Sequence, residues 1–117
     1  MATDDDVRRI AFSLPEVTEK PSYGTPGFRV KDKLFLRIRE EAEGGLVVFV
    51  PDLLDKEALL ASDTDVFFTT PHYDGYPTVL VNLDVIDLDL LTELITDSWR
   101  IKAPTKVLAA YEASLAD

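Results

Sequence analysis

Residues 28–39 read FRVKDKLFLRIR, and this stretch decides the fold. Apolar and charged side chains alternate before and after Lys31-Asp32-Lys33, with the period of two that is typical of half-buried β-strands. A short polar segment between two such runs indicates a tight connection. The stretch therefore predicts a β-hairpin, and a hairpin needs neighbouring strands and a covering layer to be stable.

The register of this hairpin depends on the length of its loop. A three-residue loop, Lys31-Asp32-Lys33, places Phe28 opposite Leu36 and Val30 opposite Leu34, whereas a two-residue loop would mix apolar and charged faces. We therefore expect the longer loop. The core face then carries Val30, Leu34, Leu36 and Ile38, and the outer face carries Arg29, Arg37 and Arg39 together with Phe35.

Segments on both sides of the hairpin supply the remaining elements. Asp4, Asp5 and Asp6 precede a first helix, residues 16–25 form a connection with a possible short strand, and residues 46–50 form a central strand. Helices are expected from Asp52, Asp87 and Pro104, with strands at 66–70 and 78–83. The helix from Asp52 carries an apolar side that includes Leu53, Leu54, Leu59 and Leu60. The pattern predicts an α+β fold with two layers, an antiparallel sheet covered by helices, in the order α-β-β-β-α-β-β-α-α.

Composition describes a single domain over residues 1–117. Hydrophobic residues make up 46% of the chain, which is enough to form a core, and there is no cysteine. The absence of cysteine excludes disulfides, thiolate metal sites and a cysteine nucleophile. No signal peptide or apolar run of membrane-spanning length is evident, so we expect a cytoplasmic protein without a membrane partner.

The hairpin differs in charge from the rest of the chain. Five basic residues stand within eleven positions, opposed there by Asp32 alone: Arg29, Lys31, Lys33, Arg37 and Arg39. This stretch carries +4 in a chain whose net charge is −10, so the remainder carries −14. Basic residues flanking an aromatic are typical of a nucleic-acid surface. The alternatives are a charged edge that prevents sheet aggregation and ion pairing with the acidic body.

A second candidate site is the aromatic turn at residues 71–77, which contains His72, Tyr73 and Tyr76. It could form the rim of a pocket with Tyr23 and Trp99 nearby, or it could be a hairpin loop with wet tyrosine hydroxyls. His72 is the single histidine, and no nucleophile-elbow motif or phosphate-binding glycine loop accompanies it. We therefore predict no catalytic residues, no metal site and no cofactor.

Five segments along the chain resemble the MmcQ/YjbR family of small bacterial proteins. They are SLPEVTE at 13–19, YGTPGFRV at 23–30, KLF at 33–35, TPHY at 70–73 and DSWR at 97–100. The resemblance implies an α+β fold like that of secretion-chaperone domains, and a DNA-binding module whose two hairpins act as wings. Asp32 stands where the resemblance leads us to expect glycine. The second wing, around residues 71–77, is not basic, because no lysine or arginine occurs between Lys56 and Arg100.

The expected function is that of a non-enzymatic binding module. By the resemblance its partner is DNA, bound weakly through the basic hairpin. The alternative is a protein- or small-molecule-binding domain that uses the sheet face or the aromatic loop around His72. A basic surface continuing from the hairpin into Arg100, Lys102 and Lys106 would favour nucleic acid, whereas basic residues paired with carboxylates would favour the alternative.

Overall fold

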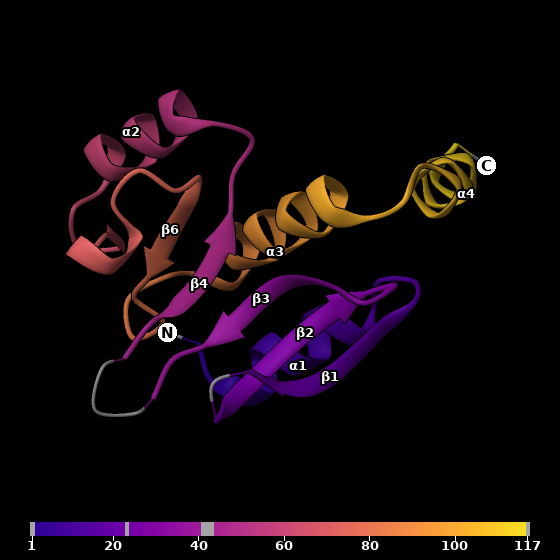
Figure 1. Ribbon diagram of the computed structural model, residues 1–117, viewed down its shortest axis with the longest axis horizontal. Coiled ribbons are helices and arrows are strands. Elements are labelled where there is room, and N and C mark those ends of the chain that lie inside the picture. Colours follow the sequence, from indigo (N-terminus) through magenta and orange to yellow (C-terminus); the bar gives the residue numbers. More distant parts are fainter. Residues whose placement is uncertain (1, 23, 41–43, 117) are drawn as a thin grey trace.

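The computed structural model describes residues 2–22, 24–40 and 44–116, and within them it forms an α+β fold (Figure 1). The elements are α1 (Asp4–Phe12), β1 (Val17–Ser22), β2 (Thr25–Val30), β3 (Lys33–Ile38), β4 (Leu46–Phe49), α2 (Leu53–Ser62), β5 (Phe67–Phe68), the 3-10 turn η1 (Pro71–Tyr73), β6 (Thr78–Val81), α3 (Leu88–Lys102) and α4 (Thr105–Leu115). The described strands form one sheet in the order β1-β2-β3-β4-β6-β5, and every neighbouring pair is antiparallel. The predicted fold class is therefore confirmed, and β4 is central as expected.

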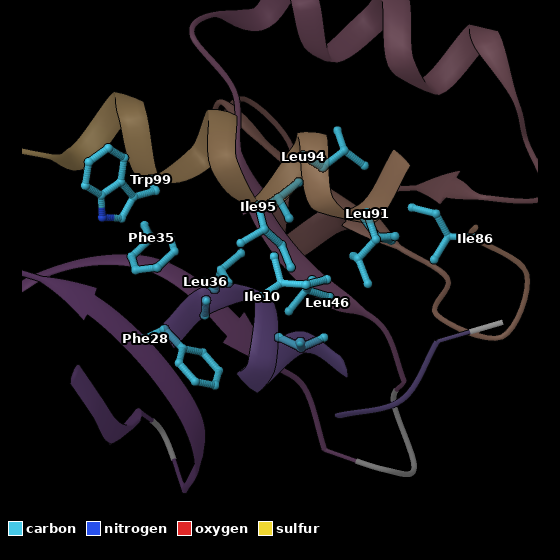
Figure 2. Close-up of a cluster of buried hydrophobic side chains, with 14 of the residues drawn as sticks. Ile10, Phe28, Phe35, Leu36, Leu46, Ile86, Leu91, Leu94, Ile95 and Trp99 are labelled. Atoms are coloured by element: carbon cyan, nitrogen blue, oxygen red, sulfur yellow. The ribbon is translucent and has the colours of Figure 1, made fainter. Parts of the chain in front are cut away.

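The hydrophobic core lies between the sheet and the layer formed by α1 and α3 (Figures 1 and 2). Helix α3 packs on β3 and β4, and α1 packs on α3 and β1. Large, fully buried side chains fill the space between the layers, among them Phe28, Phe35, Leu36, Leu91, Ile95 and Trp99. Helix α2 packs instead on β5 and β6. Within residues 2–22, 24–40 and 44–116, no helix layer of this kind covers the opposite face of β2, β3 and β4, and we call it the open face.

The described residues form six strands, one more than the five in the predicted order. Residues 17–22 were expected to be a connection with a possible short strand, but they pair along the whole of β2, from Val17 opposite Val30 to Ser22 opposite Thr25. Strand β1 is largely exposed and contains Pro21, which is compatible with an edge strand only. An edge strand that is wet on both faces lacks the apolar alternation by which strands are detected in a sequence.

The loop of the first hairpin is shorter than predicted. Val30 pairs with Lys33, so the loop is Lys31-Asp32, and both residues have positive φ angles of 47° and 69°. Two-residue hairpin turns of type I′ require positive φ at both positions. This geometry also gives a physical reason to expect glycine at position 32, because glycine adopts positive φ without steric cost.

A β-bulge then changes which side chains of β3 reach the core. Arg29 pairs with Leu34 and Phe28 pairs with Leu36, so Phe35 is the extra residue. The predicted pairing of Phe28 with Leu36 is confirmed, whereas that of Val30 with Leu34 is wrong. Phe35 is fully buried in the core and Leu34 is half-buried on the open face, the reverse of the prediction. Beyond the bulge the alternation is as expected, with Leu36 and Ile38 buried and Arg37 half-exposed.

Ser98 of α3 bridges β3 and β4 at Phe35, the extra residue of the bulge between β2 and β3. Its hydroxyl donates to the carbonyl oxygen of Phe35 at 2.5 Å and accepts from the amide of Phe49 at 2.9 Å. These two residues lie just beyond the last regular β3–β4 pair, Leu36 with Val48. The Ser98 side chain is completely buried, so it supplies hydrogen bonds that the strands do not make to each other there.

Helix α4 stands apart from the sheet at the yellow end of the chain in Figure 1. It contains no fully buried residue, but Val107, Leu108 and Tyr111 pack partly against the core. The Tyr111 ring meets the indole of Trp99 edge-on, with 4.9 Å between ring centroids. In the described part of the chain, no helix is both long and apolar enough to cross a membrane.

Candidate ligand-binding cleft on the open face of the sheet

A cleft of about 710 Å³ lies on the open face of the sheet. Strands β3, β4 and β6 form its floor, and the segment around η1 forms a wall. Its lining combines basic, aromatic and apolar side chains: Leu34, Arg37, Arg39, Glu40, Val47, Phe49, Thr70, Pro71, His72, Tyr73 and Thr78. Its volume is within the range of small-molecule sites.

Arg37 lies on β3 and Arg39 directly follows its last residue, and both reach the cleft because they alternate with the buried residues Leu36 and Ile38. Arg37 donates from Nε to the carbonyl oxygen of Ser22 at 3.3 Å and from Nη1 to the hydroxyl of Tyr73 at 3.0 Å. Arg39 donates from Nη1 to the carbonyl oxygen of Gly44 at 3.1 Å. Both guanidinium groups are thus held at the cleft, and they bring two positive charges to it.

The aromatic wall is held in place by a buried lysine. Lys56 of α2 is only 6% exposed, and its Nζ donates to the carbonyl oxygens of Tyr73 at 2.6 Å and Tyr76 at 3.0 Å. The rings of His72 and Tyr73 pack edge-on, with centroids 4.9 Å apart. A charged ammonium on backbone carbonyls gives stronger hydrogen bonds than a neutral donor would. Lys56 therefore fixes the loop that carries the aromatic side chains.

The floor of the cleft is mainly apolar but contains the hydroxyl group of Thr78. Phe49 pairs with Thr78 across β4 and β6, and the Nζ of Lys102 lies 4.3 Å from the centroid of the Phe49 ring. Thr78 is 5% exposed, and its Oγ1 has no hydrogen-bond partner among the residues that the structure describes. The hydroxyl of Thr69, which does not line the cleft, has none there either. Buried hydroxyls without partners are uncommon, and Thr78 is the one of these two that lines the cleft.

The five basic residues of the predicted nucleic-acid site divide into two groups. Arg37 and Arg39 lie in the cleft, whereas Arg29, Lys31 and Lys33 lie at the hairpin tip. There Arg29 donates to the carbonyl oxygen of Asp32 at 3.2 Å, and Lys31 forms an ion pair with Glu16 at 3.2 Å. Lys33 is exposed at the start of β3.

The basic residues near the C-terminus, Arg100, Lys102 and Lys106, do not continue the basic surface of the hairpin as one stripe. Arg100 is paired with Glu112 at 2.6 Å, and Lys102 lies over the ring of Phe49. Lys106 lines a smaller groove of about 490 Å³ together with Lys31 and Glu16. Carboxylates therefore stand beside basic residues at the tip and on α4.

The predicted aromatic site is brought together only in part. His72 and Tyr73 line the cleft, Tyr76 is on the same loop but 61% exposed, and Tyr23 lies outside the described residues. Trp99 is fully buried in the core, where its Nε1 donates to the carbonyl oxygen of Pro15 at 3.1 Å. The prediction that Trp99 belongs to a pocket is wrong, because the side of α3 that carries Trp99 faces the core.

Several residues of the site were not recognised in the sequence. The sequence pattern indicates only strand positions for Val47, Phe49 and Thr78, and it does not distinguish Lys56 from other helix residues. Lys56 precedes Leu59 and Leu60 by three and four residues, which places it on their face of α2. That spacing was available as a signal. Leu53 and Leu54, assigned to the apolar side, are 48% and 74% exposed.

An antiparallel sheet with helices over one face and a cleft on the other defines a small α+β domain whose open sheet face is the candidate site. The chain belongs to the YjbR family, because the family model described as YjbR matches residues 12–101. Helix α4 begins after the matched region.

The chain is also similar to other bacterial proteins and to a solved structure. Uncharacterised proteins of Mycobacterium bovis and Mycobacterium tuberculosis are each 39% identical over 130 residues, covering 97% of this chain and 98% of theirs. The crystal structure of the Deinococcus radiodurans protein DR2400, with domain DUF419, has a TM-score of 0.72 at 23% identity, covering 86% of this chain and 78% of that one. This likeness supports the fold.

Proposed function

We propose that this domain is a non-enzymatic binding module whose ligand is a small organic anion held in the open-face cleft. The observation that carries the proposal is the hydrogen bond between Arg37 and Tyr73, because it joins the basic hairpin and the aromatic loop into one site. Two guanidinium groups beside an apolar floor favour a ligand with a negative charge and an apolar body.

His72 is the imidazole of the cleft, and a catalytic role there would depend on its partners. His72 contacts the Tyr73 ring edge-on, and general acid–base or nucleophilic catalysis requires a positioned partner for the imidazole. Among the described residues there is no group of three or more histidine, aspartate or glutamate side chains that could hold a metal ion. The proposal therefore assigns binding rather than turnover to the site.

A second candidate, DNA binding, is favoured by one specific observation. Lys31 and Lys106 line the same groove at the hairpin tip, with Lys33 exposed nearby in the sequence. Against it, Glu16 is paired with Lys31 in that groove, and the net charge of −10 repels a polyanion. We therefore expect a dissociation constant for duplex DNA no tighter than about 10⁻⁵ M, within or above the non-specific range.

Two double variants with equal charge change separate the candidates. Arg37→Gln/Arg39→Gln removes two charges from the cleft, and Lys31→Gln/Lys33→Gln removes two from the hairpin tip. Binding of a panel of small organic anions is measured by chemical-shift changes in amide NMR spectra, and DNA binding by fluorescence anisotropy over a salt series.

The proposal expects anions to shift cleft amides, and it expects only the cleft variant to abolish those shifts. DNA binding that is lost in the tip variant, with no anion binding at the cleft, would replace the proposal with the second candidate. Thermal unfolding of both variants checks that each is folded.

A further inference from the structure

We infer that the ligand of the open-face cleft is a flat aromatic monocarboxylate that also carries a hydrogen-bonding substituent on its ring. This inference rests on the proposed function and makes its ligand specific. Three features of the cleft carry it: an aromatic lining, a pair of guanidinium groups in an acidic surrounding, and the hydroxyl of Thr78.

Aromatic rings and guanidinium groups line the cleft on several sides. Phe49 contributes a ring from β4, and His72 and Tyr73 contribute rings from η1. Arg37 and Arg39 add guanidinium groups, which are planar and stack on aromatic faces. Aromatic contacts gain energy beyond the area they bury, so a flat ring gains more here than a bulky aliphatic group does.

The arginines favour a carboxylate over a neutral group. They are two residues apart on one strand, so their Cα atoms are separated by about 7 Å and their side chains share a face. A carboxylate in the cleft lies near both guanidinium groups, and a charge-assisted hydrogen bond to either one favours it over a neutral group.

The charge around the cleft favours a single negative charge over two. Glu40 lines the cleft with the arginines, and the whole chain carries −10. The attraction of the two arginines and the repulsion of the carboxylates both grow with the charge of the ligand, and the net charge of −10, which already includes the arginines, makes the repulsion the larger of the two. A phosphate ester with a charge near −2 at neutral pH is therefore disfavoured relative to a carboxylate.

Thr78 lies where the end of the ligand opposite its carboxylate would be bound. It lies on β6, two strands away from the arginines on β3, which corresponds to roughly 10 Å across the sheet. Its buried hydroxyl lacks a partner in the described structure and adjoins Phe49 on the neighbouring strand. A hydroxyl or amino substituent on the ring system, opposite the carboxylate, would supply the missing hydrogen bond.

Five compounds test the three features separately: 2-naphthoate, 6-hydroxy-2-naphthoate, 6-hydroxy-2-naphthamide, 2-naphthyl phosphate and saturated decalin-2-carboxylate. Each is titrated into the labelled protein, and the shifts of amides in β3, β4 and β6 give its dissociation constant. We expect the hydroxynaphthoate to bind most tightly and the neutral amide to bind at least roughly tenfold more weakly, because a charge-assisted hydrogen bond is lost.

Thr78→Val keeps the shape of the side chain and removes its hydroxyl. It should cancel the advantage of 6-hydroxy-2-naphthoate over 2-naphthoate, so that the two carboxylates bind the variant with equal dissociation constants. Arg37→Gln/Arg39→Gln should weaken both carboxylates at least roughly tenfold.

Some outcomes would refute the aromatic monocarboxylate and leave the proposed anion site intact, whereas one outcome would refute both. Tighter cleft binding by the naphthyl phosphate or the decalin compound would refute the aromatic monocarboxylate while leaving an anion site. Equal binding of both naphthoates to the wild-type protein would refute the role of Thr78. If no compound, and no member of the broader anion panel, shifts the cleft amides, both the inference and the proposed function are wrong.

Discussion

Arg37 Nη1 donates a 3.0 Å hydrogen bond to the hydroxyl of Tyr73, across 36 residues of sequence. The bond connects a strand of the first hairpin with the 3-10 turn between β5 and β6. Because Arg37 is also bonded to the carbonyl oxygen of Ser22, its guanidinium group joins three segments at the cleft. Its geometry is therefore sensitive to changes in any of them.

Tyr73→Phe should reduce the free energy of unfolding by about 1 kcal/mol, the usual net value of such a hydrogen bond. It should also weaken ligand binding in the cleft, since Arg37 loses one of its anchors. Urea unfolding and the naphthoate titration measure the two effects. Tyr76→Phe, on the exposed ring of the same loop, is the control, and equal effects of both variants would contradict the role of the Arg37–Tyr73 bond.

Lys56→Met should destabilise the fold by roughly 1–2 kcal/mol, because two loop carbonyls lose their charged donor while the methionine fills similar space. Amide shifts should concentrate in residues 71–77 and in the cleft. Lys106→Met on the exposed surface of α4 serves as the matched substitution. An unchanged loop spectrum in Lys56→Met would show that the loop is held by other contacts.

Ser98→Ala should cost roughly 2 kcal/mol of unfolding free energy, since it leaves the Phe49 amide and the Phe35 carbonyl without their buried partner. Ser62→Ala, at an exposed serine near the end of α2, should have little effect. Hydrogen exchange provides a second measurement, in which the Phe49 amide should exchange faster in Ser98→Ala. If the Phe49 amide exchanged as slowly in Ser98→Ala as in the wild-type protein, β3 and β4 would have to hydrogen-bond directly to each other at this point.

Asp32→Gly should stabilise the hairpin by about 0.5 kcal/mol, because a non-glycine residue at positive φ carries a steric cost that glycine avoids. Lys33→Gly, at the first residue of β3, should instead destabilise it. Chemical denaturation of both variants tests the pair. Destabilisation by Asp32→Gly would indicate that the Asp32 side chain contributes more through its contact with Lys20 than its backbone costs.

The first helix should show a pH-dependent contribution to stability. The backbone amide of Thr3 donates to Asp6 at 2.9 Å and lowers the pKa of that carboxyl below its ordinary value of 3.8. A carboxyl with a lowered folded-state pKa stabilises the fold above its unfolded pKa and loses that effect as pH falls through the folded value. The stability difference between the wild-type protein and Asp6→Asn should therefore be constant near neutral pH and disappear in strong acid. A difference that grows on acidification would contradict this assignment.

Local signals in the sequence were sufficient for much of the fold. Asp52 and Asp87 cap α2 and α3 through their side chains, as expected for residues of this type before a helix. The run at 46–50 is apolar on both faces, and β4 lies in the middle of the sheet. These features depend on residues close in sequence, which is why they could be predicted.

The remaining features depend on contacts between distant residues. The bulge at Phe35 is supported by Ser98, which is 63 residues away, so the alternation of β3 alone predicts the wrong face for Leu34 and Phe35. Lys56 similarly bonds carbonyls 17 and 20 residues later. For the site, the sequence identified Arg37, Arg39, His72 and Tyr73 in two separate candidates, but it contained nothing that placed the two together.

Because Trp99 contacts Tyr111 of α4, the fluorescence of Trp99 reports on whether α4 is in place. The chain has one tryptophan, and that indole is buried between the core and α4. Any event that lifts α4 would bring water to a single fluorophore, whose emission would shift to longer wavelength without a background from other indoles. Helix α4 lies beyond the residues shared with the YjbR family, so this emission isolates a part of the molecule that the family match does not cover.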